Sequence, residues 1–426
     1  MFIPDLSAIG SLPKAGEYGG NVLSSSREDF LFYDLVKEAW DLGVRLDFHV
    51  HAYDAERDLM EPALLDLLDK QLASYEADPE IQTTLAHKDN KWRVTSSMQK
   101  AIRRGDKLNA KKAAHALFSS PADYEYLWKR LVVIGVEDIG LGNLYLAAQL
   151  LAVGGKKAWR TERGDRKVLF LLIDKLCESV KSRWAPDLIG LLDWTHSSMD
   201  EVAWIAKQTP EELAQITLNR QWPLRLRGLA LWTLAGTRKY PSLTLPERPG
   251  WPELLDQVAQ GFECPPLLGW VVDKWSRRHR DFMALLLPFG WEMLCASQEV
   301  WLNQIDFGEP VLVHGVLSCA FDIHTQDGKR AMAYFGKACG PANAFLSLRP
   351  KLNRPEALGC AVFYAEGGKI TPELAFDGLA EMMEVSFQEV FGKYSMDWNE
   401  AQELMKIVRD NIDKLHYSRA RVTTGK

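Results

Sequence analysis

Apolar residues recur at intervals of three and four positions through the middle of the chain, which is the spacing of one buried face of an α-helix. These stripes lie at residues 124–134, 144–151, 168–180, 202–206, 213–216 and 222–240. Only short connections separate them. Closely spaced helices of this kind predict a mainly α protein, a multi-helix bundle or array with little or no β-sheet.

The size of the chain allows more than one helical domain. Its 426 residues, of which 47% are hydrophobic, can bury a large core and divide into two or three domains. Four prolines lie between Pro241 and Pro252, so we place a boundary near residue 245. We therefore expect an N-terminal helical region over 1–95, a helical domain over 96–244 and a mostly helical domain over 245–426.

The sequence predicts a cytoplasmic protein without a membrane segment. We find no apolar run of the roughly 18 residues that a membrane span needs, and the first 20 residues lack the pattern of a signal peptide. The six cysteines include no Cys-x-x-Cys pair, so neither a zinc ribbon nor a disulfide framework is indicated. We expect no bound cofactor.

A basic segment stands out against an acidic chain. The net charge is -6, yet residues 88–112 hold nine basic and two acidic residues, a local charge of +7 that leaves -13 on the other 401 residues. Such asymmetry favours a localised anionic partner. The alternative is a helix face that pairs with acids elsewhere in the chain. The residues expected to contact DNA phosphates are Lys100, Arg103, Arg104, Lys107, Lys111 and Lys112.

Two motifs in and after this segment resemble a known family. The first motif comprises residues 98–106, which read MQKAIRRGD, and residues 113–117, which read AAHAL. The second motif comprises residues 128–143, which read WKRLVVIGVEDIGLGN. In order and spacing, residues 97 to about 190 resemble the helical region that follows the ATPase core in clamp-loader-like AAA+ replication-associated recombination ATPases, the relatives of the Werner-interacting protein. The resemblance implies a collar and oligomerisation scaffold that serves DNA replication, repair or recombination. We expect Gly140 to form the tight exit from the second helix.

The ATPase of that family has no counterpart in this sequence. A P-loop requires Gly-x-x-x-x-Gly-Lys followed by Ser or Thr, because backbone amides wrap the phosphates and the hydroxyl holds magnesium. The glycine pairs at 154–155 and 367–368 both precede a lysine, but no hydroxyl residue follows it. Only 96 residues precede the resembling stretch, too few for the nucleotide-binding domain of that family. The sequence therefore resembles the collar of that family without its ATPase domain.

A second candidate site lies at residues 322–330. Asp322, His324 and Asp327 cluster in a predicted turn, where a histidine and an orienting carboxylate are sufficient for general-base chemistry. Lys329 and Arg330 follow and are suited to hold a phosphate. The alternative is that Thr325 or Asp327 simply caps a helix over 329–337.

Two weaker candidates complete the set. Arg277, Arg278 and Arg280 lie beside two tryptophans, an arrangement that can bind unpaired bases, although basic residues also suit the negative end of a helix. His49 and His51 end a short alternating stretch, as in metal sites of the amidohydrolase type. The alternative for both histidines is a surface or capping position.

These patterns leave three functional hypotheses. The first is a non-enzymatic DNA-binding accessory protein of replication, repair or recombination, with the strandedness of the DNA left open. The second is a nucleotide- or nucleic-acid-processing enzyme with its site at Asp322 and His324. The third is a scaffold that binds replication or transcription proteins through the same basic face.

Overall fold

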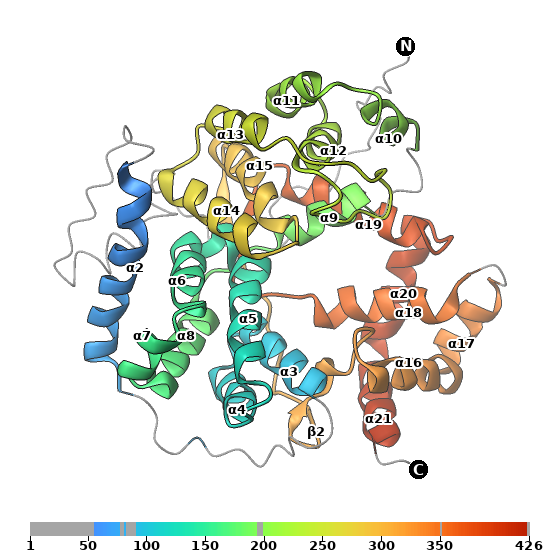
Figure 1. Cartoon of the computed structure of the whole chain (residues 1–426). Coiled ribbons are helices and arrows are strands. Elements are labelled where there is room, and N and C mark those ends of the chain that lie inside the picture. Colours follow the sequence, from blue (N-terminus) through green and yellow to red (C-terminus); the bar gives the residue numbers. More distant parts are fainter. Residues whose placement is uncertain (1–54, 77–80, 82–90, 194–198, 350–351, 424–426) are drawn as a thin grey trace.

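The computed structural model describes residues 55–76, 81, 91–193, 199–349 and 352–423. This part of the chain is an array of helices with a few short antiparallel strands, so the predicted mainly α fold class is confirmed (Figure 1). The first helices are α2 (Ala55–Ser74), α3 (Lys91–Arg103), α4 (Lys107–Phe118), α5 (Tyr124–Ile134), α6 (Leu144–Gly154), α7 (Lys157–Glu162), α8 (Asp165–Glu178) and α9 (Trp184–Asp193). The next are α10 (Met199–Ile205), α11 (Pro210–Leu218), α12 (Leu224–Ala235), α13 (Pro252–Gly261), α14 (Pro266–Arg278) and α15 (Met283–Ala296).

The remaining elements form the C-terminal third of the chain. The helices are α16 (Gln326–Ala338), α17 (Gly340–Ser347), α18 (Arg354–Val362), α19 (Leu379–Gly392), α20 (Trp398–Asp410) and α21 (Ile412–Thr423). Strand β1 (Val300–Asn303) pairs antiparallel with β4 (Glu373–Phe376), and β2 (Leu312–Val313) pairs antiparallel with β3 (Val316–Leu317). His314 and Gly315, at φ +51° and +80°, make the two-residue turn between β2 and β3.

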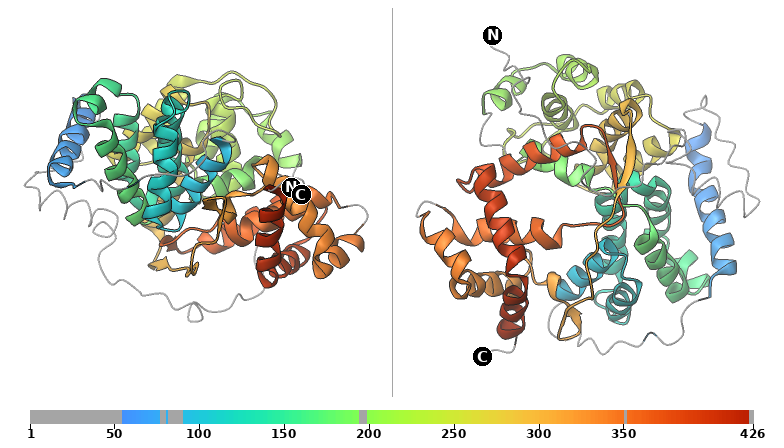
Figure 2. Two further views of the ribbon diagram at one scale, coloured as in Figure 1. Left: turned by 90° about the horizontal axis from the view of Figure 1, so that it is seen from below. Right: turned by 180° about the vertical axis from the view of Figure 1, so that it is seen from behind.

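The apolar side chains form two main cores. The larger core runs from α2 to α15 and also takes in β4 and the start of α19. The smaller core is formed by α16, α17, α18, α20, α21 and the end of α19. Figure 2 shows the helices of the smaller core beside the rest of the chain, with α20 and α21 following one another along its edge. The chain therefore enters the smaller core, returns to the larger one at β4 and leaves it again through α19.

The division into cores does not coincide with the expected boundary near residue 245. The proline-rich segment is a loop pinned at both ends, because Arg238 N donates to the carbonyl of Arg248 at 3.0 Å and Trp251 N donates to that of Leu234 at 3.0 Å. Leu245 within it is buried. The helices that follow pack on earlier ones, α14 against α6 and α15 against α9. The prolines shape a connection inside the larger core.

The second helix of the resembling motif ends as a π-helical turn over Gly135–Ile139, and a 3-10 turn over Gly140–Asn143 follows. Gly140 has φ +45°, a backbone conformation that favours glycine, so it forms the exit that its sequence context predicts. From Tyr124 to Gly154 the helical chain is long and apolar enough to cross a membrane, contrary to the expectation from the sequence. Of the most apolar 18-residue segment of this stretch, 78% is buried inside the protein, as in a core helix.

Candidate functional site

The basic segment folds into α3 and α4, which pack against each other across a short turn. Asp106 in that turn caps α4, since its Oδ1 accepts a hydrogen bond from the backbone N of Asn109 at 3.0 Å. Helix α3 also contacts α8, β3 and the turn that follows β3, and buries most of its surface. The cations near its C-terminal end, Lys100 and Arg103, therefore lie inside the protein.

Arg103 lies at the centre of a buried group of charges. Its Nε donates to Oδ1 of Asp138 at 2.9 Å, and its Nη2 donates to Glu137 at 3.0 Å. Arg183 donates to Oδ1 of Asp138 at 2.6 Å, and Gln99 donates to Oδ2 at 2.7 Å. Burial alone would raise the pKa of Asp138, but Arg103 and Arg183 outweigh it and hold this pKa below its ordinary value. The Asp138 carboxylate therefore stays ionised although it has no exposed surface.

This buried group joins the two motifs on which the family resemblance rests. Gln99 and Arg103 belong to the first motif, and Glu137 and Asp138 belong to the second. Arg130, also in the second motif, donates to Glu137 at 3.2 Å. The motifs thus bind each other through ion pairs and hydrogen bonds, and these contacts engage Arg103, Arg130, Glu137 and Asp138 within the protein.

Helix α3 also holds the candidate catalytic turn. Lys100 Nζ lies 2.5 Å from Oδ2 of Asp322, and the two side chains are only 5% and 1% exposed. Near the start of the same helix, Arg93 Nε lies 3.2 Å from Oδ2 of Asp327. The two candidate sites that the sequence suggests separately, the basic helix and the 322–327 turn, therefore meet and neutralise each other.

The turn itself is built as the start of α16. Thr325 Oγ1 accepts from the backbone N of Gly328 at 3.1 Å, so the predicted alternative of a helix cap is observed. The Asp322 carboxylate accepts from the backbone N of His324 at 2.9 Å, while the imidazole packs edge to face on Phe363 at 5.5 Å between ring centroids. Asp322 is thus directed to Lys100 and to the backbone of its own turn, and the His324 ring packs on Phe363.

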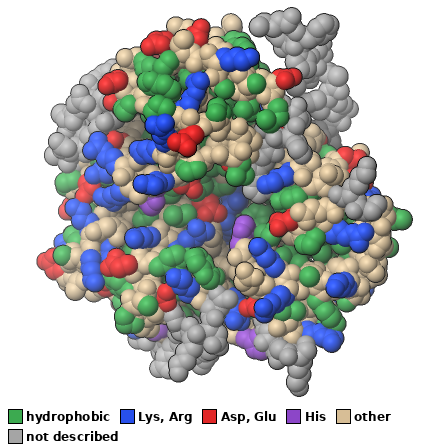
Figure 3. Space-filling view, turned by 45° about the vertical axis from the view of Figure 1, so that its right-hand side comes forward, with side chains coloured by type: hydrophobic (Ala, Val, Ile, Leu, Met, Phe, Trp, Pro, Cys, Tyr) green, Lys and Arg blue, Asp and Glu red, His purple; other side chains and the backbone are tan. Residues whose placement is uncertain are grey.

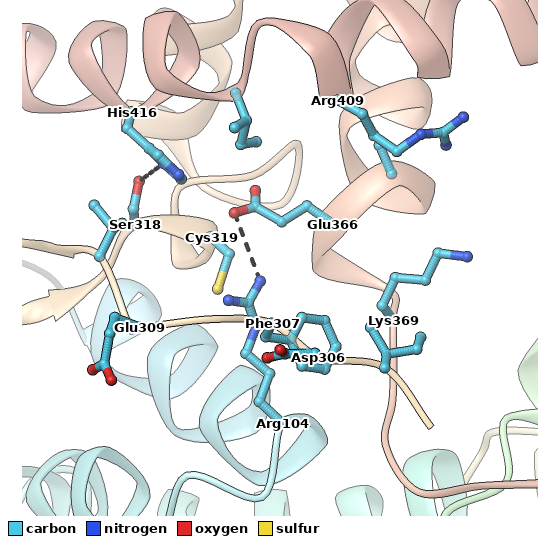
Figure 4. A pocket seen from close by; sticks show the side chains of 14 residues that line it. Arg104, Asp306, Phe307, Glu309, Ser318, Cys319, Glu366, Lys369, Arg409 and His416 are labelled. Carbon is cyan, nitrogen blue, oxygen red and sulfur yellow. Dashed lines mark hydrogen bonds and ion pairs between the residues drawn. The ribbon is translucent and has the colours of Figure 1, made fainter. Parts of the chain in front are cut away.

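Arg104, the first residue after α3, lines a pocket together with Glu366 (Figure 4). Its Nη2 lies 3.6 Å from Oε1 of Glu366, and its guanidinium lies over the ring of Phe307 at 4.5 Å from the centroid. Glu366 has a closer partner in Arg419, whose Nη1 is 2.8 Å from Oε2. Burial would raise the pKa of Glu366, but Arg419 and Arg104 outweigh it and hold this pKa low.

The cations of α4 are also partly engaged. Lys107 pairs with Glu178 on the surface, and Lys111 Nζ lies 2.7 Å from Oδ2 of Asp174 in a mostly buried contact. Lys112 is partly buried. Of the six cations expected to contact phosphates, five therefore have a carboxylate partner within the described residues. The alternative interpretation, a basic helix that pairs with acids elsewhere in the chain, describes most of this segment.

The cations at the end of α14 match the interpretation of a helix terminus. Arg278 Nη1 donates to the carbonyl of Leu151 at 2.7 Å, and Arg277 Nε donates to Asp273 at 3.0 Å, while Arg280 is exposed. The neighbouring Trp270 and Trp275 are buried, at 1% and 0% exposure. Their rings are therefore closed off from nucleic-acid bases.

The remaining sequence candidates are His49 and His51, which lie outside the described residues. In the part of the chain that the structure describes, no group of three or more His, Cys, Asp or Glu side chains is placed to hold a metal ion.

Comparison with known proteins adds no relative. No family model, no curated protein and no solved structure matches this chain. The likeness to the collar of replication-associated ATPases therefore rests on the two motifs alone, and the function must be argued from the structure.

A basic surface that the sequence indicated only in part lies on α16 and α21, which pack side by side in the smaller core. Lys329, Arg330 and Lys337 are exposed along α16, and Arg421 on α21 reaches across to donate to the hydroxyl of Tyr334 at 2.6 Å. We call these four cations and Tyr334 the α16–α21 face. Figure 3, which turns this side of the molecule forward, shows Lys and Arg side chains over much of it.

Helical spacing explains why this face is open. Positions 329, 333 and 337 lie one turn apart, as do positions 330 and 334, whereas Met332 and Phe335 on the opposite side enter the smaller core. A carboxylate near the face is Asp327, whose side chain is 17% exposed; it pairs with Arg93 at 3.2 Å and with Arg330, whose Nη1 lies 3.9 Å from Oδ1. Among the described residues, Lys329 and Lys337 form no ion pair. The α16–α21 face is thus a net positive surface with cations turned to solvent.

Proposed function

We propose that this chain is a non-enzymatic helical protein that binds nucleic-acid phosphates through the α16–α21 face. The observation that carries the proposal is this solvent-directed set of four cations on an otherwise acidic chain with a net charge of -6. Lys329 and Lys337, which form no ion pair within the described residues, can release the counterions of a phosphate backbone, and the acidic remainder suppresses unspecific adhesion. An accessory role in DNA replication, repair or recombination, which the resemblance implies, is part of the proposal.

This assignment moves the expected contact away from α3. Lys100 and Arg103 are bound to buried carboxylates, so contact with a phosphate would first require breaking these ion pairs. Lys329 and Lys337 need no such rearrangement, because they are exposed and form no ion pair within the described residues. The Arg421 guanidinium lies over the Tyr334 ring, 4.8 Å from its centroid, which fixes one cation at the edge of the face.

Salt dependence tests the proposal. If four cations each contact a phosphate, the logarithm of the affinity should fall with the logarithm of the salt concentration with a slope of about -3 to -4. Fluorescence anisotropy with labelled single- and double-stranded DNA, measured over a salt series, gives this slope for both forms. Changing Lys329, Arg330 and Lys337 to Ala should weaken binding at least tenfold and bring the slope to about -1.

A matched control changes the same amount of charge elsewhere. Lys129, Lys207 and Lys239 are exposed on other parts of the surface, and their replacement by Ala should leave the affinity within twofold of wild type. If the control variant loses as much affinity as the α16 variant, net charge alone explains binding, and the proposal that the α16–α21 face binds DNA is refuted. Absence of binding to either DNA at low salt also refutes the proposal.

A further inference from the structure

A pocket of about 510 Å³ lies where α3, the segment after β1, and the smaller core meet. Its volume is within the range of sites for small organic molecules. One wall is the stretch 305–311, another is the turn that contains Glu366, and the ends of α20 and α21 supply the rest (Figure 4). Apolar side chains on these walls, Ile305, Val311 and Ile412, can cover the body of a ligand.

Arg104 at this pocket has a buried donor without a partner. Its Nη2 atom is buried and makes no hydrogen bond within the described residues. The contact with Glu366 at 3.6 Å is too long for a hydrogen bond, and Arg419 holds that carboxylate at 2.8 Å. A buried guanidinium donor of this kind carries a free-energy cost that an oxyanion in the pocket would remove.

Two further cations line the same pocket. Lys369 and Arg409 are exposed and form no ion pair within the described residues. In Figure 4 they lie on the same side of Glu366, one from the loop before β4 and the other from the last turn of α20. Their head groups point away from Arg104, toward solvent, so they lie at the rim of the pocket and can attract an anionic ligand to it (Figure 4).

The acids of the pocket do not cancel this preference. Three acids line the pocket. Glu366 is compensated by Arg419, and Asp306 accepts a hydrogen bond from the backbone N of Gly308 at 2.8 Å. Glu309 lies on the opposite side of the pocket from Lys369 and Arg409 (Figure 4). On the far side, Ser318 Oγ lies 2.8 Å from His416 Nδ1 and also 3.3 Å from Arg419 Nη1.

We infer that this pocket binds a small organic molecule that carries a phosphate or carboxylate group, with Arg104 holding the anionic group and Lys369 and Arg409 attracting it from the rim. The apolar walls hold the rest of the ligand, and Phe307 keeps the Arg104 guanidinium in place from its other side. The inference uses none of the residues of the α16–α21 face, so it stands or falls separately from nucleic-acid binding.

Calorimetry and thermal unfolding of the full chain test the pocket with four probes. The anionic probes are AMP, citrate and inorganic phosphate, and adenosine is the uncharged counterpart of AMP. We expect AMP or citrate to bind and to raise the Tm, and adenosine to do neither. The inference is refuted if neither organic anion binds, if adenosine binds as well as AMP, or if inorganic phosphate binds as tightly as the organic anions.

Variants then locate the binding. Lys369 and Arg409 are exposed, so their joint replacement by Ala should leave the fold intact and weaken binding at least tenfold. The control variant replaces Lys393 and Lys406, two exposed lysines that do not line the pocket, and should bind as wild type does. Unchanged binding in the Lys369 and Arg409 variant, or equal loss in the control, would place the ligand elsewhere.

Discussion

Replacing Asp138 with Asn should destabilise the protein more than any surface charge change. The carboxylate has no exposed surface and accepts from Arg103 at 2.9 Å, Arg183 at 2.6 Å and Gln99 at 2.7 Å. The substitution keeps the shape of the side chain, so no cavity adds to the effect. What it removes is the negative charge, and two buried guanidinium groups then share Glu137 alone.

The magnitude follows from the cost of an unpaired buried charge. Breaking a buried ion pair costs about 3–5 kcal/mol, and Glu137, at 3.0 Å from Arg103 and 3.4 Å from Arg183, retains part of the pairing. We therefore expect a loss near the lower limit, about 3 kcal/mol in the free energy of unfolding. With about 2.1 cal/mol/K of unfolding entropy per residue, this corresponds to a fall in Tm of about 3 °C for a chain of this size.

Urea unfolding followed by tryptophan fluorescence and circular dichroism measures this loss. Because the pKa of Asp138 is lowered in the folded state, its contribution is complete at neutral pH and disappears only as the pH falls through that lowered value. The control is Asp410→Asn, which breaks an exposed pair with Lys406 and should cost under about 0.5 kcal/mol. Equal losses in the two variants would refute the role assigned to the buried charges.

Two further substitutions probe the interior. Burial raises the pKa of Asp187 to about 7 against the opposing effect of Arg183, so the free energy of unfolding of the wild type should fall as the pH rises from about 4 to about 7. Asp187→Asn should remove this pH dependence and be the more stable protein at pH 8. If stability depends on pH in the same way in both proteins, the reasoning is wrong. A Cβ on Gly328 would lie 2.0 Å from the carbonyl O of Asp322, whereas nothing lies within 4 Å of a Cβ on Gly340. Gly328→Ala should therefore lower the free energy of unfolding in urea by at least about 2 kcal/mol, and Gly340→Ala by under about 0.5 kcal/mol. Similar losses in the two variants would disprove the close approach at Gly328.

The sequence predicts the helices well because their determinants are local. The stripe at 124–134 and the Gly140 exit depend on residues three or four positions apart, and both are found as expected. The sequence predicts a domain boundary in the proline-rich loop near residue 245, because composition alone does not reveal that the backbone N of Trp251 donates a hydrogen bond to the carbonyl of Leu234. Which core a helix joins is decided by tertiary packing.

The candidate sites were harder to predict for a similar reason. Lys100 and Asp322 are separated by 222 positions, and neither local pattern indicates that they pair. Thr325 could be recognised as a helix cap from the sequence, but the choice between capping and catalysis depended on where Asp322 points. The sequence of α16 is amphipathic like that of many helices, so it does not show that its cations are exposed until the buried side of the helix is known.

The path of the chain between its two cores has a consequence for genetic dissection. Strand β4 and the start of α19 belong to the larger core although they follow α16–α18 in sequence, and α20 and α21 come after them. A stop codon anywhere between β1 and β4 therefore deprives both cores of packing partners, and neither core is encoded by one uninterrupted stretch. Activities of the two halves should be separated with point substitutions, because a deletion that appears to remove one half also damages the other.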